Sequence, residues 1–337
     1  MTSIKALQRR AREGRQWLMD ACLPLWAEAG VNRHGLFIDA LQLNHRAPDD
    51  IETVQVETQA RQTALFAIAY GQGWQMDRAL ELCEAGLECL AGPALREDGQ
   101  PGTQLDAEGD ALTQAQTSHA LALELLHTHA RIVDLVPPLA ERAETAAKAL
   151  RGALGTEHEA IDPDMAAATC LSELAWLEAL PERQDRTRLR AASAALLGRL
   201  ETAGAPTVFD AVDMIWRMGR LKEDIDGEGL KRFYLQALEA VGPDGAIAHG
   251  ARAERHARDQ ALALRAHLAM MESALCPDAI VPAALGFDTL MDENLTFEGG
   301  WIARHGADGL PLDQDMPATL ALDLAGALIR LLEVVEA

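Results

Sequence analysis

One charged residue stands where an apolar helical run is about to begin. Residues 54–74 read VQVETQARQTALFAIAYGQGW, and Gln59 and Arg61 lie directly before the apolar run. Leaving a guanidinium unpaired in a protein core is costly, so Arg61 must either face a polar cavity or pair with an acid. Both interpretations stay open: Arg61 belongs to a ligand pocket, or it only holds an inner loop by pairing with Asp39 or Glu57.

The residue spacing gives no support for metal or cofactor chemistry. The five cysteines include no CxxC pair, and we expect them to be small buried hydrophobic residues. His127 and His129 are two residues apart, so a helix points their rings to different faces. Neither GxGxxG nor GxxxxGK occurs in the sequence. We therefore predict neither a metal ion nor a cofactor.

The composition is that of a globular chain of packed helices. Of the 337 residues, 49% are apolar and only 4% are aromatic, and alanine is abundant. The formal net charge of −22 argues against nucleic acid and anionic membranes as partners. No apolar run reaches membrane-spanning length, and no signal-peptide pattern follows the basic N-terminal residues, so we expect a cytoplasmic protein.

Helical periodicity dominates the chain, and no convincing run of alternating strand residues interrupts it. The pattern predicts helices over Leu7–Leu25, Thr63–Gly71, Met76–Leu90, 112–132, 138–153, 163–180, 186–202, 207–220, 228–241, 256–275 and 317–335. Tight turns alternate with longer loops at 31–53, 92–111, 242–255 and 286–316. This alternation indicates stacked helical hairpins, arranged as an open solenoid or a closed toroid. No linker divides the chain, so we predict a single domain over 1–337.

Two stretches of the sequence resemble the N-acylglucosamine 2-epimerase superfamily, including its bacterial mannose-6-phosphate-isomerase-like branch. The first lies in the first quarter of the chain and reads QWLMDACLPLWAEAGVNRHGLFIDALQL, followed by VETQARQTALFAIAYGQGW. The second lies near the C-terminal end and reads GGWIARHGADGLPLDQDMPATLALDLAGAL. The middle of the chain matches the family only in outline.

The resemblance implies an all-α fold, an (α/α)6 barrel with six inner and six outer helices and a sugar pocket at one mouth. It places Arg61 in the central cavity as part of the sugar site, and we assign Gln59 and Asp39 to substrate binding with it. The implied small-molecule partner is a sugar or a sugar phosphate. Which sugar this is, and whether the chain forms a homodimer, stay open.

The histidines that the family uses for proton transfer are not found where the alignment expects them. In DPDMAAATCLSEL, Ala166 stands at the histidine position. In VFDAVDMIWRM, Asp210 stands at the histidine and Asp213 at a glutamate. In PATLALDLAGAL, Asp323 stands at the histidine.

Asp210 and Asp323 are therefore predicted to take part in proton transfer, together with His119. An aspartate pKa of about 3.9 against about 6.5 for histidine leaves a carboxylate roughly 3.5 kcal/mol short of driving force as a base. Burial or a like-charged neighbour raises a carboxyl pKa and offsets this deficit. His119 aligns with a family residue on an inner helix, and His256 is the next candidate. The alternative is that Asp210 and Asp213, three apart on one helix face, are capping or solvated acids.

Three further residues are predicted to bind substrate, because they align with family motifs that this sequence keeps only in part: Asp213, Trp216 and Gln260. Tryptophans also offer stacking platforms for sugar rings, although most are expected in the core. Trp301 lies in a predicted loop and is the one expected to contact a sugar.

Three hypotheses about function follow. The first is a sugar isomerase or 2-epimerase that moves a proton at the carbon next to the sugar carbonyl by general acid and base catalysis. The second is a catalytically silent barrel that binds a sugar or a protein partner. The third and weakest is a glycoside hydrolase that uses paired carboxylates, as unrelated enzymes on similar barrels do.

Overall fold

The structure, a computed structural model, describes residues 4–110, 112, 119–154, 198, 200, 203–220, 227–249 and 253–336. The helix predicted at 163–180 and the motif around Ala166 lie outside these residues, as does nearly all of the helix predicted at 186–202. The described chain is mostly helical, in agreement with the sequence pattern. Within it, no helix is long and apolar enough to cross a membrane.

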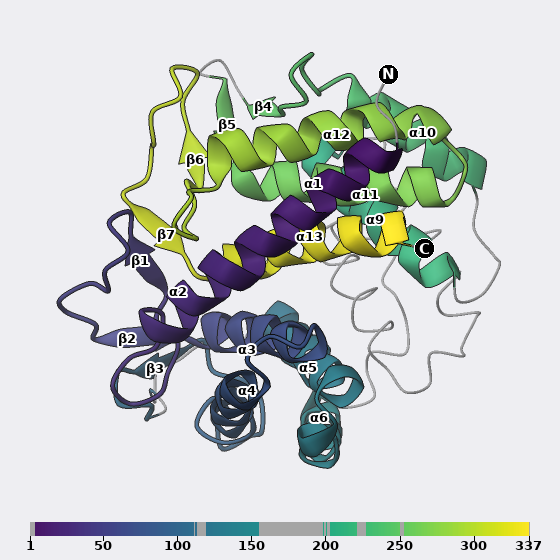
Figure 1. Cartoon of the computed structure of the whole chain (residues 1–337). Coiled ribbons are helices and arrows are strands. Elements are labelled where there is room, and N and C mark those ends of the chain that lie inside the picture. The colour runs from purple at the N-terminus through teal and green to yellow at the C-terminus, as the bar shows by residue number, and fades with distance from the viewer. Residues whose placement is uncertain are drawn as a thin grey trace.

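The inner helices pack side by side in the order α5, α3, α13, α11, α9 (Figure 1). Their bounds are α3 Val56–Gly71, α5 His119–Leu135, α9 Ala205–Arg220, α11 Ala257–Glu272 and α13 Leu320–Glu336. α3 buries residues on almost every face, which is typical of a helix surrounded by other helices. Arg61 on α3 reaches Glu124 on α5, and Gly71 lies against Leu135, so these two inner helices run in parallel.

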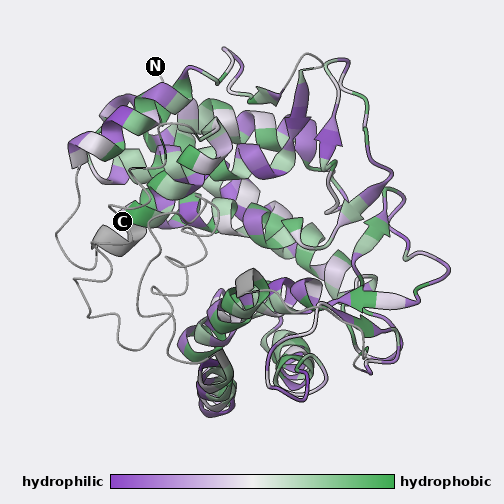
Figure 2. Ribbon diagram, turned by 180° about the vertical axis from the view of Figure 1, so that it is seen from behind, coloured by the Kyte–Doolittle hydropathy of each residue, from purple (hydrophilic) through white to green (hydrophobic). Residues whose placement is uncertain are grey.

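Each inner helix has an outer helix packed against it: α4 on α3, α6 on α5, α10 on α9, α12 on α11 and α1 on α13. The outer helices are α1 Ile4–Trp17, continued by α2 Leu23–Glu28, and α4 Met76–Ala91, α6 Ala140–Leu154, α10 Gly227–Leu238 and α12 Ile280–Thr289. α1 buries only one stripe, formed by Leu7, Ala11, Gly14 and Trp17. Figure 2 shows the hydrophilic and hydrophobic bands that such amphipathic helices produce. The described residues hold these five pairs, and their arrangement is that of the predicted (α/α)6 barrel.

Short antiparallel strands gather at the end of the barrel where the inner helices begin (Figure 1). β2 leads directly into α3, β5 leads directly into α11, and β7 ends shortly before α13. The strands are β1 Ala40–Gln42, β2 Thr53–Gln55, β3 Gln104–Asp106, β4 Ala248–His249, β5 Glu254–His256, β6 Arg304–His305 and β7 Asp315–Pro317. They pair as β1–β7, β2–β3 and β4–β5–β6. The long loops predicted from the sequence are therefore tied to one another across this mouth.

The main differences from the sequence prediction concern α3 and α12. α3 begins at Val56, seven residues before the apolar run, so Arg61 lies in its second turn. The helix α12 was not predicted, and its last residues fall in the predicted loop 286–316. Pro282 and Gly286 lie inside it, and both residue types normally indicate a break. Burial of its Ala283, Ala284 and Phe287 against α11 and α1 outweighs this local preference.

Two inner-helix histidines are fully buried, His267 on α11 and His129 on α5. The Nδ1 atom of His267 lies 3.0 Å from the hydroxyl oxygen of Tyr234, and the ring packs edge-on against Phe209. Burial lowers the pKa of His267 to about 3. Burial, together with the nearby charge of Arg151, lowers the pKa of His129 to about 4. Both imidazoles are therefore neutral in the folded protein at physiological pH.

We predict that each of these two histidines lowers the free energy of unfolding by about 2 kcal/mol between pH 7 and pH 5. In this range the unfolded imidazoles, with a pKa of about 6.5, bind protons that the folded ones exclude, so protonation favours the unfolded state. Their contribution is complete above that pKa and is lost as the pH falls. Urea unfolding of the wild type, His267→Phe and the exposed control His34→Phe at the two pH values measures it. An equal loss in wild type and His267→Phe would contradict the prediction.

Candidate functional site

A pocket of about 280 Å³ opens where α3, α11 and α13 begin. We call it the mouth pocket, and its lining residues are Glu57, Arg61, His256, Arg258, Ala303, Arg304, Asp313, Pro317, Thr319, Leu320 and Asp323. Three inner helices supply charged side chains from their first turns, because the short strands β2, β5 and β7 bring all three helix starts to one end of the barrel. The pocket is therefore polar although the helices around it are largely apolar.

Arg61 joins three elements inside this pocket. Its Nε donates to the carbonyl oxygen of Thr319 at 2.7 Å, and its Nη2 donates to Oδ2 of Asp323 at 2.8 Å. Its Nη1 lies 3.6 Å from Oε1 of Glu124 on α5. Burial opposes the charge on this guanidinium, but the carboxylates of Asp323, Glu124 and Glu57 outweigh burial and raise the pKa of Arg61. Arg61 therefore lines a polar pocket and is also paired, with Asp323 and Glu124 and not with Asp39 or Glu57. Its part in binding a ligand stays a prediction.

Asp323 is held between cations. Besides Arg61, the Nε of Arg258 lies 3.4 Å from its Oδ2. Burial tends to raise the pKa of Asp323, but the guanidinium charges of Arg61, Arg258 and Arg265 overcome this and hold it below the usual range. The side chain is therefore an ionised carboxylate at neutral pH and a strong hydrogen-bond acceptor.

A second charged group lies deeper in the barrel, around Arg265 on α11. Its Nε donates to Oδ2 of Asp213 at 2.9 Å, its Nη2 contacts the same oxygen, and Nη2 also lies 3.9 Å from Oδ1 of Asp210. Asp213 is fully buried, whereas about a fifth of the Asp210 side chain is exposed. Burial and the nearby charges of Asp323 and Asp213 raise the pKa of Asp210, although Arg265 and Arg258 act against them.

Asp213 and Trp216 belong to the opposite end of the barrel interior. A second cavity of about 200 Å³ is lined there by Ile68, Gly71, Gln72, Arg131, Leu135, Asp213, Arg265, Gly326, Ile329, Arg330 and Glu333. The Nε1 of Trp216 donates to Oε2 of Glu272 at 2.8 Å, and Arg330 contacts the same carboxylate oxygen. The structure therefore does not bring these two predicted binding residues to the mouth pocket.

Gln59 and Gln260 occupy the fourth positions of α3 and α11 and do the same structural task. Gln59 accepts from the Phe37 amide at 2.9 Å and donates to the Phe37 carbonyl at 2.6 Å. Gln260 accepts from the Ile247 amide at 3.3 Å and donates to the Ile247 carbonyl at 3.2 Å. Each buried amide thus anchors the loop before its helix, and neither lines the mouth pocket.

Asp39 is likewise engaged in holding the start of α3. Its Oδ1 accepts from the backbone amide of Gln55 at 3.0 Å and from the hydroxyl of Thr58 at 2.5 Å. A carboxylate at this position satisfies amide groups that a helix start leaves unpaired. Asp39 was predicted to bind substrate, and the structure gives it the role of a cap supplied by a distant loop.

The expectation that Trp301 forms an open stacking platform is not supported. Its side chain is 0% exposed and stacks on Trp26, with the ring centroids 4.9 Å apart and the planes 11° from parallel. The residue lies in a loop, as predicted, but the loop folds inward. Next to it Gly299 has a φ of +92°, and any Cβ there would meet the backbone of Ala21 at 2.4 Å. This close approach of the loop to Ala21 carries Trp301 into the core.

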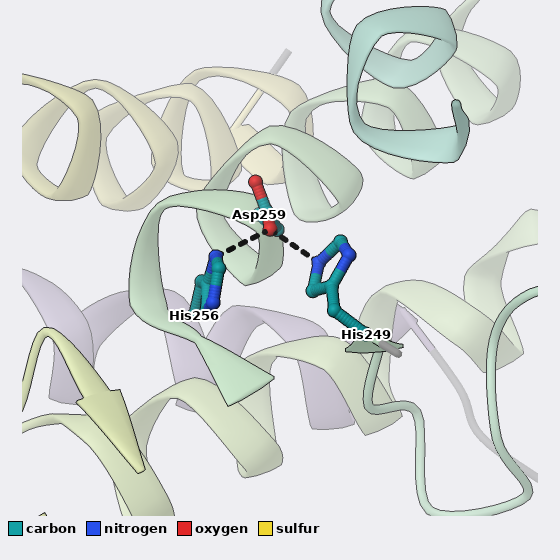
Figure 3. Close-up of side chains that lie close together, drawn as sticks. All are labelled: His249, His256 and Asp259. Carbon is teal, nitrogen blue, oxygen red and sulfur yellow. Dashed lines mark hydrogen bonds and ion pairs between the residues drawn. The ribbon is translucent and has the colours of Figure 1, made fainter. Parts of the chain in front are cut away.

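His119 is the first residue of α5, and its backbone lies at the end of the barrel where α3 also begins. The description of this residue does not extend to its side chain. A different histidine, His256, lines the mouth pocket directly. It forms a cluster with His249 and Asp259, in which possible metal-ligating atoms lie within 4.8 Å of one another (Figure 3).

Sequence reasoning missed Arg258, an exposed residue at the pocket lining, and three charged residues of the barrel interior: Glu124, Arg265 and Arg330. Arg265 and Arg330 stand next to apolar sequence, as Arg61 does. The rule that identified Arg61, that a guanidinium in an apolar run requires an acid or a polar cavity, applies equally to Arg265 and Arg330. Applied along the whole sequence, it finds both of them.

No protein-family model and no curated protein sequence matches this chain. Solved structures do match it. The cellobiose 2-epimerase from Spirochaeta thermophila DSM 6192 aligns over 98% of both chains with a TM-score of 0.83 and 15% identity. A D-mannose isomerase aligns over 98% of both chains with a TM-score of 0.76 and 12% identity. A family 76 glycoside hydrolase from a bovine Bacteroides thetaiotaomicron strain covers 98% of this chain and 78% of its own, with a TM-score of 0.64 and 8% identity.

These likenesses confirm the fold that the sequence resemblance implied. The chain has the same (α/α)6 barrel fold as the cellobiose 2-epimerase and the D-mannose isomerase. The glycoside hydrolase has a related barrel and a different reaction, so the fold by itself does not define the chemistry of this chain.

We predict that Asp213→Ala lowers the free energy of unfolding by about 3–5 kcal/mol, because it leaves the buried guanidinium of Arg265 without its closest carboxylate. The control is Glu84→Ala, which breaks an exposed pair with Arg142 and is expected to cost about 1 kcal/mol or less. Chemical denaturation of both variants measures the difference. Similar losses in the two variants would show that the Asp213–Arg265 pair contributes no more than a surface pair.

Proposed function

We propose that this protein is a sugar isomerase or 2-epimerase that binds its substrate in the mouth pocket and transfers a proton at the carbon next to the sugar carbonyl. The observation that carries the proposal is the group of Arg61, Arg258 and Asp323, which pair with one another in a pocket at the start of the inner helices. The likeness in fold to a cellobiose 2-epimerase and a D-mannose isomerase supports it.

The pocket suits a small polar ligand. Its volume of about 280 Å³ is near the lower end of the range for small-molecule sites, which favours a substrate of roughly monosaccharide size. The lining contains three arginines, Arg61, Arg258 and Arg304, and three acids, Glu57, Asp313 and Asp323. Hydroxyl groups can both donate to such carboxylates and accept from such guanidinium groups. Because these charges balance, the pocket offers no surplus of cations to favour a phosphorylated sugar over a neutral one.

In the proposed reaction a base removes the proton beside the carbonyl, and the electron pair of the C–H bond moves toward the carbonyl oxygen to form an enediolate. The guanidinium groups of Arg61 and Arg258 stabilise the negative charge on that oxygen. Return of a proton to the same carbon from the opposite face gives the epimer. Its return to the former carbonyl carbon, with transfer of the proton of the adjacent hydroxyl to the former carbonyl oxygen, interconverts aldose and ketose. No net atom or electron is gained in either outcome.

Of the residues proposed for proton transfer, Asp210 is the one whose pKa is raised, by burial and by the nearby carboxylates of Asp323 and Asp213. It does not line the mouth pocket itself but lies below it, close enough to Asp323 for the two charges to interact, so we propose that a bound sugar reaches down to it. Asp323 is better suited to accept hydrogen bonds from sugar hydroxyls, since its pKa is held low by three guanidinium groups. His119 is proposed as the second acid–base group, from its place at the start of α5 beside α3. A cytoplasmic location and a homodimer remain predictions from the sequence.

The alternative is a catalytically silent barrel that binds a sugar or a protein partner. The observation that favours it is that the Arg61 guanidinium already bonds to Thr319 and Asp323 and pairs with Glu124. In this reading the ion pairs hold the barrel together, and the sugar contacts only their exposed edges.

We predict that incubation in heavy water introduces deuterium at the carbon beside the carbonyl of at least one of mannose, mannose 6-phosphate, glucose, N-acetylmannosamine and cellobiose. Mass spectrometry of the recovered sugar measures the exchange. Asp210→Asn is expected to slow it by about 100-fold or more, the typical contribution of a positioned acid or base. The exposed control Asp77→Asn is expected to leave the rate unchanged. Exchange that is equally fast in both variants would remove Asp210 from the mechanism.

We also predict that a sugar that binds raises the melting temperature, and that Arg61→Ala abolishes this shift. The control is Arg142→Ala, which removes an exposed arginine on α6 and should keep the full shift. Circular dichroism establishes that both variants are folded. If a sugar shifts the melting temperature but no deuterium enters it, the silent-barrel alternative is correct. A shift that survives in folded Arg61→Ala would place the sugar elsewhere.

A further inference from the structure

Two histidines and an aspartate meet at the edge of the mouth pocket, on β4, β5 and α11 (Figure 3). The strands pair antiparallel with Ala248 opposite Arg255 and His249 opposite Glu254. His249 and His256 are therefore diagonal neighbours on one face of the ladder, since side chains alternate between the two faces. Asp259 follows His256 by three residues, which places it one helical turn into α11 on the same side. We call His249, His256 and Asp259 the histidine cluster.

The polar atoms of the histidine cluster converge on one carboxylate oxygen. The Nε2 atom of His249 lies 2.6 Å from Oδ2 of Asp259, and the Nδ1 atom of His256 lies 3.3 Å from the same oxygen. The two imidazole rings stack with centroids 4.7 Å apart and planes 26° from parallel. Asp259 is buried, whereas about a third of each histidine side chain is exposed. Solvent and small ions can therefore reach the histidines while the carboxylate stays fixed.

The donor set and its dimensions match a transition-metal site. Two imidazole nitrogens and one carboxylate oxygen are ligands that zinc prefers, and Zn–N and Zn–O bonds are about 2.0–2.2 Å long. Around a tetrahedral ion such bonds separate the ligand atoms by roughly 3.3 Å. In the cluster all ligand atoms lie within 4.8 Å of one another, so small side-chain shifts bring them to that spacing.

The charges next to the cluster do not oppose a cation. Oε2 of Glu254 lies 3.9 Å from Nε2 of His256, on the side of the ring away from Asp259. A carboxylate in this place is a suitable outer partner, because a ligating imidazole normally directs its other nitrogen toward an oxygen acceptor. Arg258 and Arg304 also line the pocket, but Arg258 contacts Asp323 and Arg304 is bonded to Asp313.

We propose that His249, His256 and Asp259 form a binding site for one zinc-class divalent ion at the edge of the mouth pocket. His249 binds through Nε2, His256 through Nδ1 and Asp259 through its carboxylate. Three protein ligands leave at least one position for water or for an oxygen atom of a pocket ligand. The site was hidden from sequence reasoning because seven residues separate the histidines, and only the β4–β5 pairing brings them together. The proposal does not depend on the proposed sugar reaction.

The test is zinc binding to the full chain, prepared without a histidine tag and freed of metal by a chelator. Isothermal titration calorimetry is expected to find one zinc ion per chain with micromolar or tighter affinity. His249→Ala and Asp259→Asn should each weaken binding by at least about 100-fold, since even loss of an outer partner costs 10–100-fold. The exposed control His34→Ala should bind zinc as the wild type does. No sugar is present, so the result is separate from the deuterium experiment.

X-ray absorption at the zinc edge gives a second measurement that does not depend on the variants. Two imidazole ligands and one carboxylate in the zinc-loaded wild type are the expected result. Absence of stoichiometric binding in the wild type would overturn the proposal. So would binding that is unchanged in folded His249→Ala and Asp259→Asn, or an absorption spectrum without imidazole ligands.

Discussion

The ion pair between Arg61 and Asp323 is the interaction on which the rest of the structure depends. It joins α3 to α13, which are adjacent in the barrel but separated by most of the chain. The same guanidinium reaches Thr319 and Glu124, so one side chain links the starts of three inner helices. Breaking such a buried pair from one side leaves an uncompensated charge and costs about 3–5 kcal/mol. The position of the mouth pocket therefore follows from where this cation can be neutralised.

The remaining charges of the barrel interior follow the same constraint. Arg265 is neutralised by Asp213, and Arg330 by Glu272. Replacing a buried ion pair with apolar residues is often neutral or stabilising, so these pairs are weak evidence of a purely structural purpose. The proposed binding of a polar ligand would give these charges a second purpose. The interior holds two carboxyl groups of different acidity, since the pKa of Asp323 is lowered and that of Asp210 is raised. Asp323 is therefore the stronger acid and Asp210 the stronger base.

The sequence predicted the fold well and the site only partly. Helical periodicity and two family-like motifs were sufficient for the (α/α)6 barrel, and the cost of burying Arg61 led correctly to a polar cavity. Gln59, Gln260 and Asp39 hold loops in the structure, and a buried amide or carboxylate that fixes a loop has the same sequence signature as one that binds a sugar. Trp301 was assigned by its loop position, which says nothing about whether the loop folds inward. The histidine cluster depends on strand pairing and had no local signal.

The packing of α1 against α13 has a consequence for how the protein is made. These helices lie at opposite ends of the described chain, yet they are side by side (Figure 1). During synthesis, the apolar stripe of α1 that packs on α13 therefore stays uncovered until residues 320–336 have been added to the chain. Contacts between such remote segments form slowly, and the exposed intermediates are prone to aggregation. Chaperones that shield apolar surface during translation should therefore matter more for this chain than for a protein built from local contacts.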